Sequence, residues 1–289
     1  MPQTINTNLV SLNAQRNLNT SQASLATAMQ RLSSGLRVNS AKDDAAGLAI
    51  AERMHTQVRG MNVAMRNAND GISMAQVGEG ALGKISDMLQ RMRELAVQSA
   101  NGTNTSADRD SLNNEYLQLA EEAKRTLAGT TFNGLAVLAS TSAMTFQVGA
   151  NNSTTLDQIT VSSIDWSGTT ALTAALGTAV GTAPTGTAAI AGTDGTNATT
   201  AISGIDAAIN AINGQRAVFG AVQNRFESVI ANLSVSVENQ AAARSRIMDA
   251  DYAAETANLS RAQILQQAGN AMVAQANQLP AQVLSLLQR

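Results

Sequence analysis

The two ends of the chain are almost free of acidic residues, and both repeat apolar residues at coiled-coil spacing. Residues 1–42 contain no Asp or Glu, and residues 256–289 contain none either. The stripe of the first segment consists of Leu25, Met29, Leu32 and Leu36. The stripe of the last segment consists of Leu265, Met272, Leu279, Val283 and Leu286. Steps of three, four and seven are typical of a helical seam, so we expect these segments to pair with each other, with copies of themselves, or with both.

Composition narrows the class of protein. Aromatic residues make up 2% of the 289 residues, and there are only three prolines, which favours long helices packed at close distance over an aromatic-rich globular core. A net charge of −2 argues against nucleic-acid binding. The sequence contains no run of 18 apolar residues, so we expect no membrane span. Its first residues do not have the pattern of a cleaved secretion signal. We therefore expect either a cytosolic protein or one that leaves by a route without a cleaved signal.

Two long helices dominate the pattern. From Met54 to Ala75 apolar residues alternate steps of four and three, and the stripe resumes slightly out of phase up to Ala96. We expect a helix of about 65 Å, with a small bend at Gly78 and Gly80 where the phase shifts. A returning stripe begins near residue 203 and consists of Ile205, Ile212, Phe219, Phe226 and Leu233. The two halves of the chain are therefore predicted to run back along each other as a coiled-coil-like rod, in a mainly α fold.

The middle of the chain reads differently. A turn at 101–106 precedes a helix that Gly129 closes, and a turn signal at 132–134 precedes short strand patterns at 145–148 and 159–161. We expect a small β region there. Residues 168–200 contain eleven Thr, nine Ala and six Gly with a single charge. This composition predicts a short, loop-rich insertion that faces solvent.

No residue pattern predicts catalysis, a cofactor or a metal. His55 is the only histidine, cysteine is absent, and no His-Glu-x-x-His motif is present. Asp43 and Asp44 are interpreted as helix-capping acids rather than an acid–base pair. Met54, Met61 and Met65 are interpreted as adaptable core packing. We expect a protein that is not an enzyme.

Several longer segments carry a family resemblance. They are Thr4–Asn8, Leu32–Gly47, Gln90–Gln98, Phe132–Gly134, Phe146–Ala150, Ser245–Ala253 and Gln278–Leu287. Together they resemble bacterial flagellin, over residues 1–150 and 203–289. The centre is short, so the resemblance implies that the outer domains of long flagellins are reduced or missing.

The resemblance implies a subunit of the flagellar filament that serves motility outside the cell. It implies export in an unfolded state by a type III apparatus with an export chaperone, and assembly into a homopolymer beside cap and junction proteins. The expected domains are an inner helical domain (1–42 with 256–289), a helical rod with the β region (43–165 with 203–255) and a variable insertion (166–202). A hook–filament junction or adaptor protein is the alternative reading. A third hypothesis is a secreted enzyme carried on a flagellin-like frame, and it fails because the sequence contains no set of catalytic residues.

The resemblance also implies contacts with host sensors. Arg91, Leu95 and Glu115 match positions that a flagellin-sensing Toll-like receptor engages, with Leu95 expected beside the buried stripe. The alternative for this face is a filament contact or plain solvated surface. The residues that resemble leucines read by cytosolic sensors and by the export chaperone are Val283, Leu284, Leu286 and Leu287. Packing inside the inner domain is their alternative role.

Overall fold

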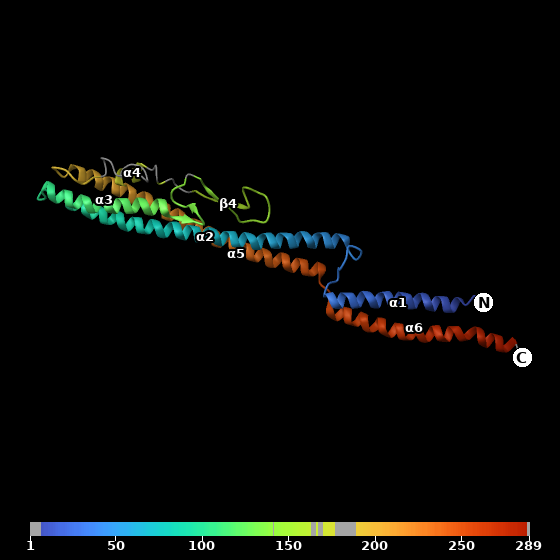
Figure 1. The fold of residues 1–289 in the computed structure, drawn as a ribbon. Helices are drawn as coiled ribbons and strands as arrows, with labels where there is room; N and C mark the ends of the chain where they lie inside the picture. The colour runs from blue at the N-terminus through green and yellow to red at the C-terminus, as the bar shows by residue number, and fades with distance from the viewer. Residues whose placement is uncertain (1–6, 141, 163–165, 167–169, 177–188, 288–289) are drawn as a thin grey trace. The chain divides into compact units, whose positions relative to one another are not determined.

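The computed structural model describes residues 7–140, 142–162, 166, 170–176 and 189–287, with the backbone alone at 170, 171, 174 and 279–287 (Figure 1). The fold is mainly helical, as predicted. The chain divides into two compact units. The first contains residues 1–56 and 238–289, and the second contains residues 57–237.

The first unit is built on an antiparallel pair of helices from the two ends of the chain. These are α1 (Leu9–Ser34) and α6 (Tyr252–Leu287), which lie side by side in Figure 1. The side chain of Asn8 caps α1 and also donates to the carbonyl of Ala276 at 2.7 Å. Ser11 Oγ donates to Asn277 Oδ1 at 2.7 Å. These bonds fix the register, so the start of α1 lies beside the last turns of α6.

Both chain segments of this unit change from one helix to the next at a shared bridge. Gly35 ends α1 in the left-handed region (φ 70°), which glycine adopts without a steric cost. Leu36 then pairs with Asp249 in an antiparallel bridge. The amide of Arg37 donates to Met248 O at 2.6 Å, and that of Ala250 donates to Gly35 O at 2.9 Å. The two breaks are therefore tied together by backbone hydrogen bonds.

The acids at 43 and 44 cap and fix the turn before the next helix, as predicted. Asp44 Oδ1 accepts from the amide of Gly47 at 2.8 Å at the start of α2 (Ala45–Ser99). Asp43 Oδ2 accepts from the amide and hydroxyl of Ser40, and these bonds lower the pKa of Asp43. Neither acid is placed for acid–base chemistry.

The second unit packs α2 against α3 (Ser106–Gly129) and α5 (Thr196–Met248). The predicted stripe of α5 is buried at Ile205, Ile212, Phe219 and Phe226. The helix α2 continues without a break through Gly78 and Gly80, where the sequence predicts a small bend. Thr105 caps α3 in a reciprocal capping box with Asp108.

Two hairpins form the predicted β region. The strands β1 (Thr131–Phe132) and β2 (Leu135–Ala136) are joined by Asn133 and Gly134, both with positive φ, as a type I′ turn requires. The strands β3 (Met144–Gln147) and β4 (Gln158–Val161) pair antiparallel. Ile159 and Val161 point into the core of the unit.

The expectation of a solvent-facing insertion at 168–200 is wrong for the parts described. Residues Thr170–Leu176 form the helix α4, and α5 begins at Thr196 rather than near 203. The buried residues in the described parts of this segment are Leu172, Ala175, Leu176, Ile190 and Ala198. Residues 177–188 lie outside the described part of the chain. A few apolar side chains among many Thr and Gly residues are enough to pack these pieces onto the unit.

Buried hydrogen bonds also attach α4 and the segment before α5 to the second unit. The Tyr116 hydroxyl donates to Ala175 O at 2.8 Å, and its burial raises the pKa of Tyr116. The buried Arg109 guanidinium donates to Ser99 O, Asn101 O and Thr193 O at 2.9–3.2 Å. It therefore joins the end of α2 to the segment before α5.

Candidate functional site

The inner face of the α1–α6 pair combines small residues with several leucines. On α1 the residues turned toward the partner helix recur at alternating steps of three and four, and are Ser11, Ala14, Leu18, Ser21, Leu25, Ala28 and Leu32. On α6 they are Leu259, Ala262, Gln266, Gly269, Val273 and Ala276. A Cβ on Gly269 would lie 3.1 Å from Leu18 Cδ1, so this position takes a residue without a side chain. Small residues let the two helices approach closely.

Larger apolar side chains lie on exposed faces of the same two helices. Of the predicted seam, Met29 is 57% exposed, Leu265 is 50% exposed and Met272 is 60% exposed. Leu9, Val10, Leu12 and Ile264 are exposed as well. Leu25, Leu32 and Leu36 are half-buried. The side chains of Leu279, Val283 and Leu286 lie outside the described residues.

The predicted seam of α6 is therefore not the face that α6 turns toward α1 of the same chain, and its role in pairing between copies stays a prediction. The half-buried Gln266 and Val273 each follow a seam residue, Leu265 and Met272, by one position, which places the contact face roughly 100° around the helix from the seam. The missed signal is a repeat of small residues at seven-residue spacing, Ala262, Gly269 and Ala276. Small side chains at these positions let the two helices approach closely.

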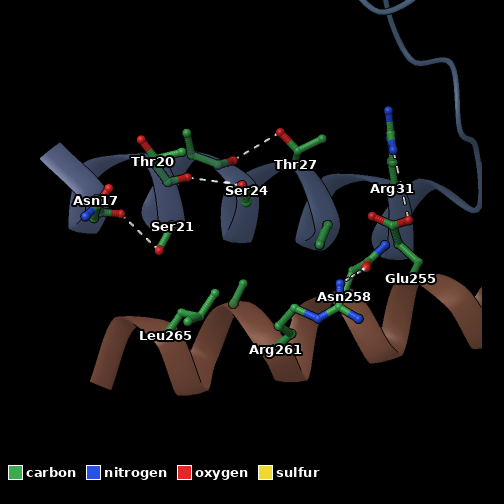
Figure 2. Close-up of a pocket in the computed structure, with 13 residues that line it drawn as sticks. Asn17, Thr20, Ser21, Ser24, Thr27, Arg31, Glu255, Asn258, Arg261 and Leu265 are labelled. Carbon is green, nitrogen blue, oxygen red and sulfur yellow. Dashed lines mark hydrogen bonds and ion pairs between the residues drawn. The ribbon is translucent and has the colours of Figure 1, made fainter. Parts of the chain in front are cut away.

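A polar groove of about 830 Å³ runs between α1 and α6 (Figure 2). Its α1 wall carries hydroxyl side chains that donate back to carbonyls of their own helix. Thr20, Ser21, Ser24 and Thr27 each donate to the carbonyl four residues earlier, at 3.0–3.1 Å. These four hydroxyl donors already have partners, so covering them leaves no hydroxyl hydrogen unpaired, whereas the buried Nε of Arg31 on the same wall has no hydrogen-bond partner.

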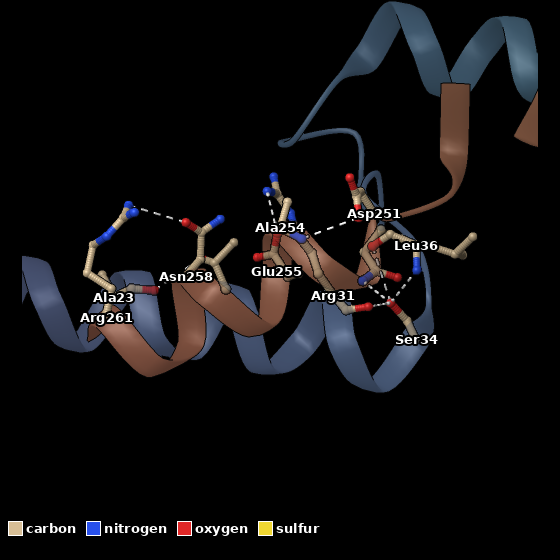
Figure 3. Close-up of polar contacts among 11 residues, drawn as sticks. Ala23, Arg31, Ser34, Leu36, Asp251, Ala254, Glu255, Asn258 and Arg261 are labelled. Atoms are coloured by element: carbon tan, nitrogen blue, oxygen red, sulfur yellow. Dashed lines mark hydrogen bonds and ion pairs between the residues drawn. The ribbon is translucent and has the colours of Figure 1, made fainter. Parts of the chain in front are cut away.

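Two of the few charged side chains of the pair, Arg31 and Glu255, lie where the helices meet the bridge (Figure 3). Arg31 Nη1 lies 4.0 Å from the buried Glu255 Oε2, which is the first-turn acid of α6. Arg261 donates to Asn258 within the same helix at 3.5 Å. The rest of α1 carries only Arg16, and the rest of α6 up to 287 carries no charge. Helices that face only water usually carry far more charge.

Two family models match this chain. The bacterial flagellin N-terminal helical region matches residues 5–143, and the bacterial flagellin C-terminal helical region matches residues 202–287. A flagellin of Halalkalibacterium halodurans is 47% identical over 284 residues, covering 98% of this chain and 99% of that protein. The chain belongs to the flagellin family. The resemblance inferred from the sequence motifs is thereby confirmed.

Further relatives agree with this flagellin over its whole length. The flagellar filament 33 kDa core protein of Treponema phagedenis is 43% identical and aligns over 98% of this chain and 99% of its own. A solved flagellar hook-associated protein of Vibrio parahaemolyticus is 12% identical, covers 72% of this chain and 100% of its own, and has a TM-score of 0.56. At that identity the likeness concerns the fold alone.

This flagellin is a structural subunit of the extracellular flagellar filament, and it is not an enzyme. Filament formation implies a homopolymer. In the described part of the chain, no group of three or more metal-ligating side chains comes together. No described helix is both long enough and apolar enough to cross a bilayer. His55, the lone histidine, is half-buried on α2 of this flagellin.

The structure brings two of the three receptor-matched residues of this flagellin together. Arg91 on α2 and Glu115 on α3 form an ion pair at 2.9 Å, and Arg91 also binds Glu94 at 2.9 Å. Hydrogen bonds to Glu94 and then Glu115 raise the pKa of Arg91. Leu95 was expected beside the buried stripe, and this is wrong, because its side chain is 1% exposed within the core. Leu95 therefore packs in the core of the second unit and does not meet solvent.

Proposed function

We propose that the exposed, weakly charged faces of α1 and α6 are the surfaces through which copies of this flagellin assemble. The observation that carries the proposal is the placement of Met29, Leu265 and Met272. They are large apolar side chains that stay exposed on helices whose shared contact combines small residues with half-buried leucines such as Leu18 and Leu259. Contiguous exposed apolar surface is a mark of an interaction site. Because the filament is a homopolymer, the partner is a second copy of this chain.

Elementary energetics support assembly over isolation for these helices. Burying a Leu or Met side chain contributes roughly 1.5–3 kcal/mol, whereas an Ala side chain contributes much less. The fully buried apolar residues of the α1–α6 contact are the small Ala28, Ala262 and Ala276, whereas the leucines beside them are only half-buried. The pair is therefore weakly held within one chain and gains most of its apolar burial from neighbours. Its internally bonded hydroxyls add no desolvation penalty.

A pair of substitutions tests this role. Leu265→Asp with Met272→Asp places two carboxylates on the exposed face and should abolish elongation of filament seeds. Gln267→Asp adds a carboxylate at an exposed position elsewhere on α6 and is the matched control. Far-UV circular dichroism should show the second unit folded in both variants. Full-length filaments from the folded double variant would overturn the proposal.

Weak intrachain pairing also fits the proposed export in an unfolded state by a type III apparatus. We propose that the inner domain comprises residues 1–42 with 256–289, and that an export chaperone binds its last turns. The supporting residues are Val283, Leu284, Leu286 and Leu287, whose side chains lie outside the described residues. Cap and junction proteins and cytosolic sensors would meet the same helices. Limited proteolysis before residue 41 and after residue 255 should be fast in the monomer and slow in the filament.

We also propose a narrower receptor surface than the sequence suggested. Arg91 and Glu115 are both about half exposed, on adjacent helices, and can be reached by a host Toll-like receptor. Leu95 is removed from that surface because it is buried. Arg91→Ala should lower receptor activation by the monomer while leaving its unfolding transition unchanged. Unchanged activation by that variant would contradict the proposal.

A further inference from the structure

The eleven methionines of the chain differ sharply in exposure. Met61, Met74, Met92 and Met248 are buried, and Met54, Met65, Met88 and Met144 are half-buried. Met1 lies outside the described residues. Among the methionines that the structure describes, only Met29 and Met272 are exposed. Both belong to the face that we propose for assembly.

Exposure decides which thioether meets an oxidant. With hydrogen peroxide or an organic peroxide, a methionine sulfur gives two electrons and forms an S–O bond as the O–O bond breaks. The peroxide leaves as water or as an alcohol, and the methionine becomes a sulfoxide. The chain has no cysteine, so no thiol competes for the oxidant. The reaction converts a flexible apolar side chain into a polar, chiral one.

We infer that Met29 and Met272 are sites of sulfoxidation in the unassembled subunit, and that their oxidation blocks its incorporation into the filament. The second half of this inference rests on the proposed assembly surface. Neither side chain belongs to the inner contact, where Ala28, Gly269 and Val273 lie. The oxidised subunit therefore keeps its own fold and loses only its ability to pack against a neighbour.

The free energy of burying a polar group sets how strongly sulfoxidation should weaken the association of subunits. Burying a polar group without a hydrogen-bond partner lowers an association constant by about tenfold to a hundredfold. Leu265, one heptad before Met272 on the same helix face, is apolar and offers a sulfoxide no hydrogen-bond donor. We expect the critical concentration for seeded growth to rise by about that factor for each sulfoxide that the interface buries. Because methionine sulfoxide reductases reverse the modification, the block is reversible.

The test begins with the site. Monomer is treated with hydrogen peroxide, and peptides are mapped by mass spectrometry for the addition of one oxygen atom. Met29 and Met272 should gain oxygen well before Met61, Met74, Met92 and Met248. Equal oxidation of exposed and buried methionines in folded monomer would overturn the site assignment. This arm needs no polymer, so it is independent of the assembly proposal.

The second arm measures growth from filament seeds. Peroxide-treated wild type should elongate poorly and should recover after treatment with methionine sulfoxide reductases and a thiol reductant. Met29→Leu with Met272→Leu keeps apolar volume and should elongate before and after peroxide. Met92→Leu, at a buried position, is the control and should remain peroxide-sensitive.

Three results separate the two claims. Normal elongation by wild type whose Met29 and Met272 are fully oxidised overturns the inference. Loss of elongation by the peroxide-treated leucine double variant overturns it as well. Normal elongation by untreated Leu265→Asp with Met272→Asp would contradict the assembly surface itself, which is a different failure.

Discussion

The ring of Phe226 packs directly over the backbone of Gly71. A Cβ on Gly71 would lie 2.6 Å from both Cε2 and Cζ of that ring, closer than side-chain atoms approach one another. Seven residues further along α2, Gly78 meets Phe219 in the same way, with the corresponding distance 2.9 Å. Gly71 and Gly78 of α2 therefore receive aromatic rings from α5.

The first prediction concerns this contact. Gly71→Ala should destabilise the second unit by about 1–3 kcal/mol, because Phe226 is fully buried and also packs edge-on against Phe146 at 5.5 Å. Gly80→Ala is the matched control, since no described atom lies within 4 Å of its added Cβ. It should stabilise the helix by about 0.5–1 kcal/mol. Denaturant titration followed by the fluorescence of the buried Trp166 measures both.

The second prediction separates packing from surface charge on α2. Leu95→Ala should cost about 2–5 kcal/mol of unfolding free energy, because it empties a buried site in the core. Arg91→Ala should cost less than about 1 kcal/mol, because its ion pairs are exposed to water. Equal effects of the two substitutions on the unfolding midpoint would contradict the burial of Leu95.

A third prediction concerns α4 and the segment before α5. Tyr116→Phe removes the buried hydrogen bond to Ala175 O and should destabilise the second unit by about 1–3 kcal/mol. Tyr252→Phe removes an exposed hydroxyl and should change stability by less than about 0.5 kcal/mol. Deletion of 172–198 should unfold the unit, since it removes Ile190 and the start of α5. A folded deletion variant would instead support the expected solvent-facing insertion.

The fourth prediction is a pH dependence at the start of α3. Hydrogen bonds from Thr105 hold the pKa of Asp108 below its ordinary value of 3.8. A lowered carboxyl pKa contributes stability that is complete above the unfolded value and is lost as pH falls through the folded value. The difference in Tm between wild type and Asp108→Ala should thus be largest near neutral pH and shrink below pH 3.8. A constant difference from pH 7 to pH 2 would show that the charged cap is unimportant.

Much of the fold followed from local patterns. The α5 stripe, the turn at 101–106 that precedes α3 and the Asn133–Gly134 turn were predicted, because each depends on spacing or on a local conformational preference. The burial of Leu95 was not predicted, because α2 packs against two helices and its buried face is therefore wider than one stripe. Such width depends on tertiary partners that periodicity alone does not reveal.

The candidate site was only partly predictable for a related reason. The apolar residues of α1 and α6 were identified, but not which of them face the partner helix. That choice depends on how closely the helices approach, and thus on Ala262, Gly269 and Ala276. Likewise α4 was missed because only Leu172 and Leu176 stand out in a segment dominated by Thr, Ala and Gly.

The most direct test of the account is an electron cryomicroscopy map of the filament at side-chain resolution. The account predicts that Met29, Leu265 and Met272 are buried against neighbouring subunits, while Ala28, Ala262 and Ala276 remain in the contact between α1 and α6 of one chain. A filament in which Met29, Leu265 and Met272 all face solvent would contradict it.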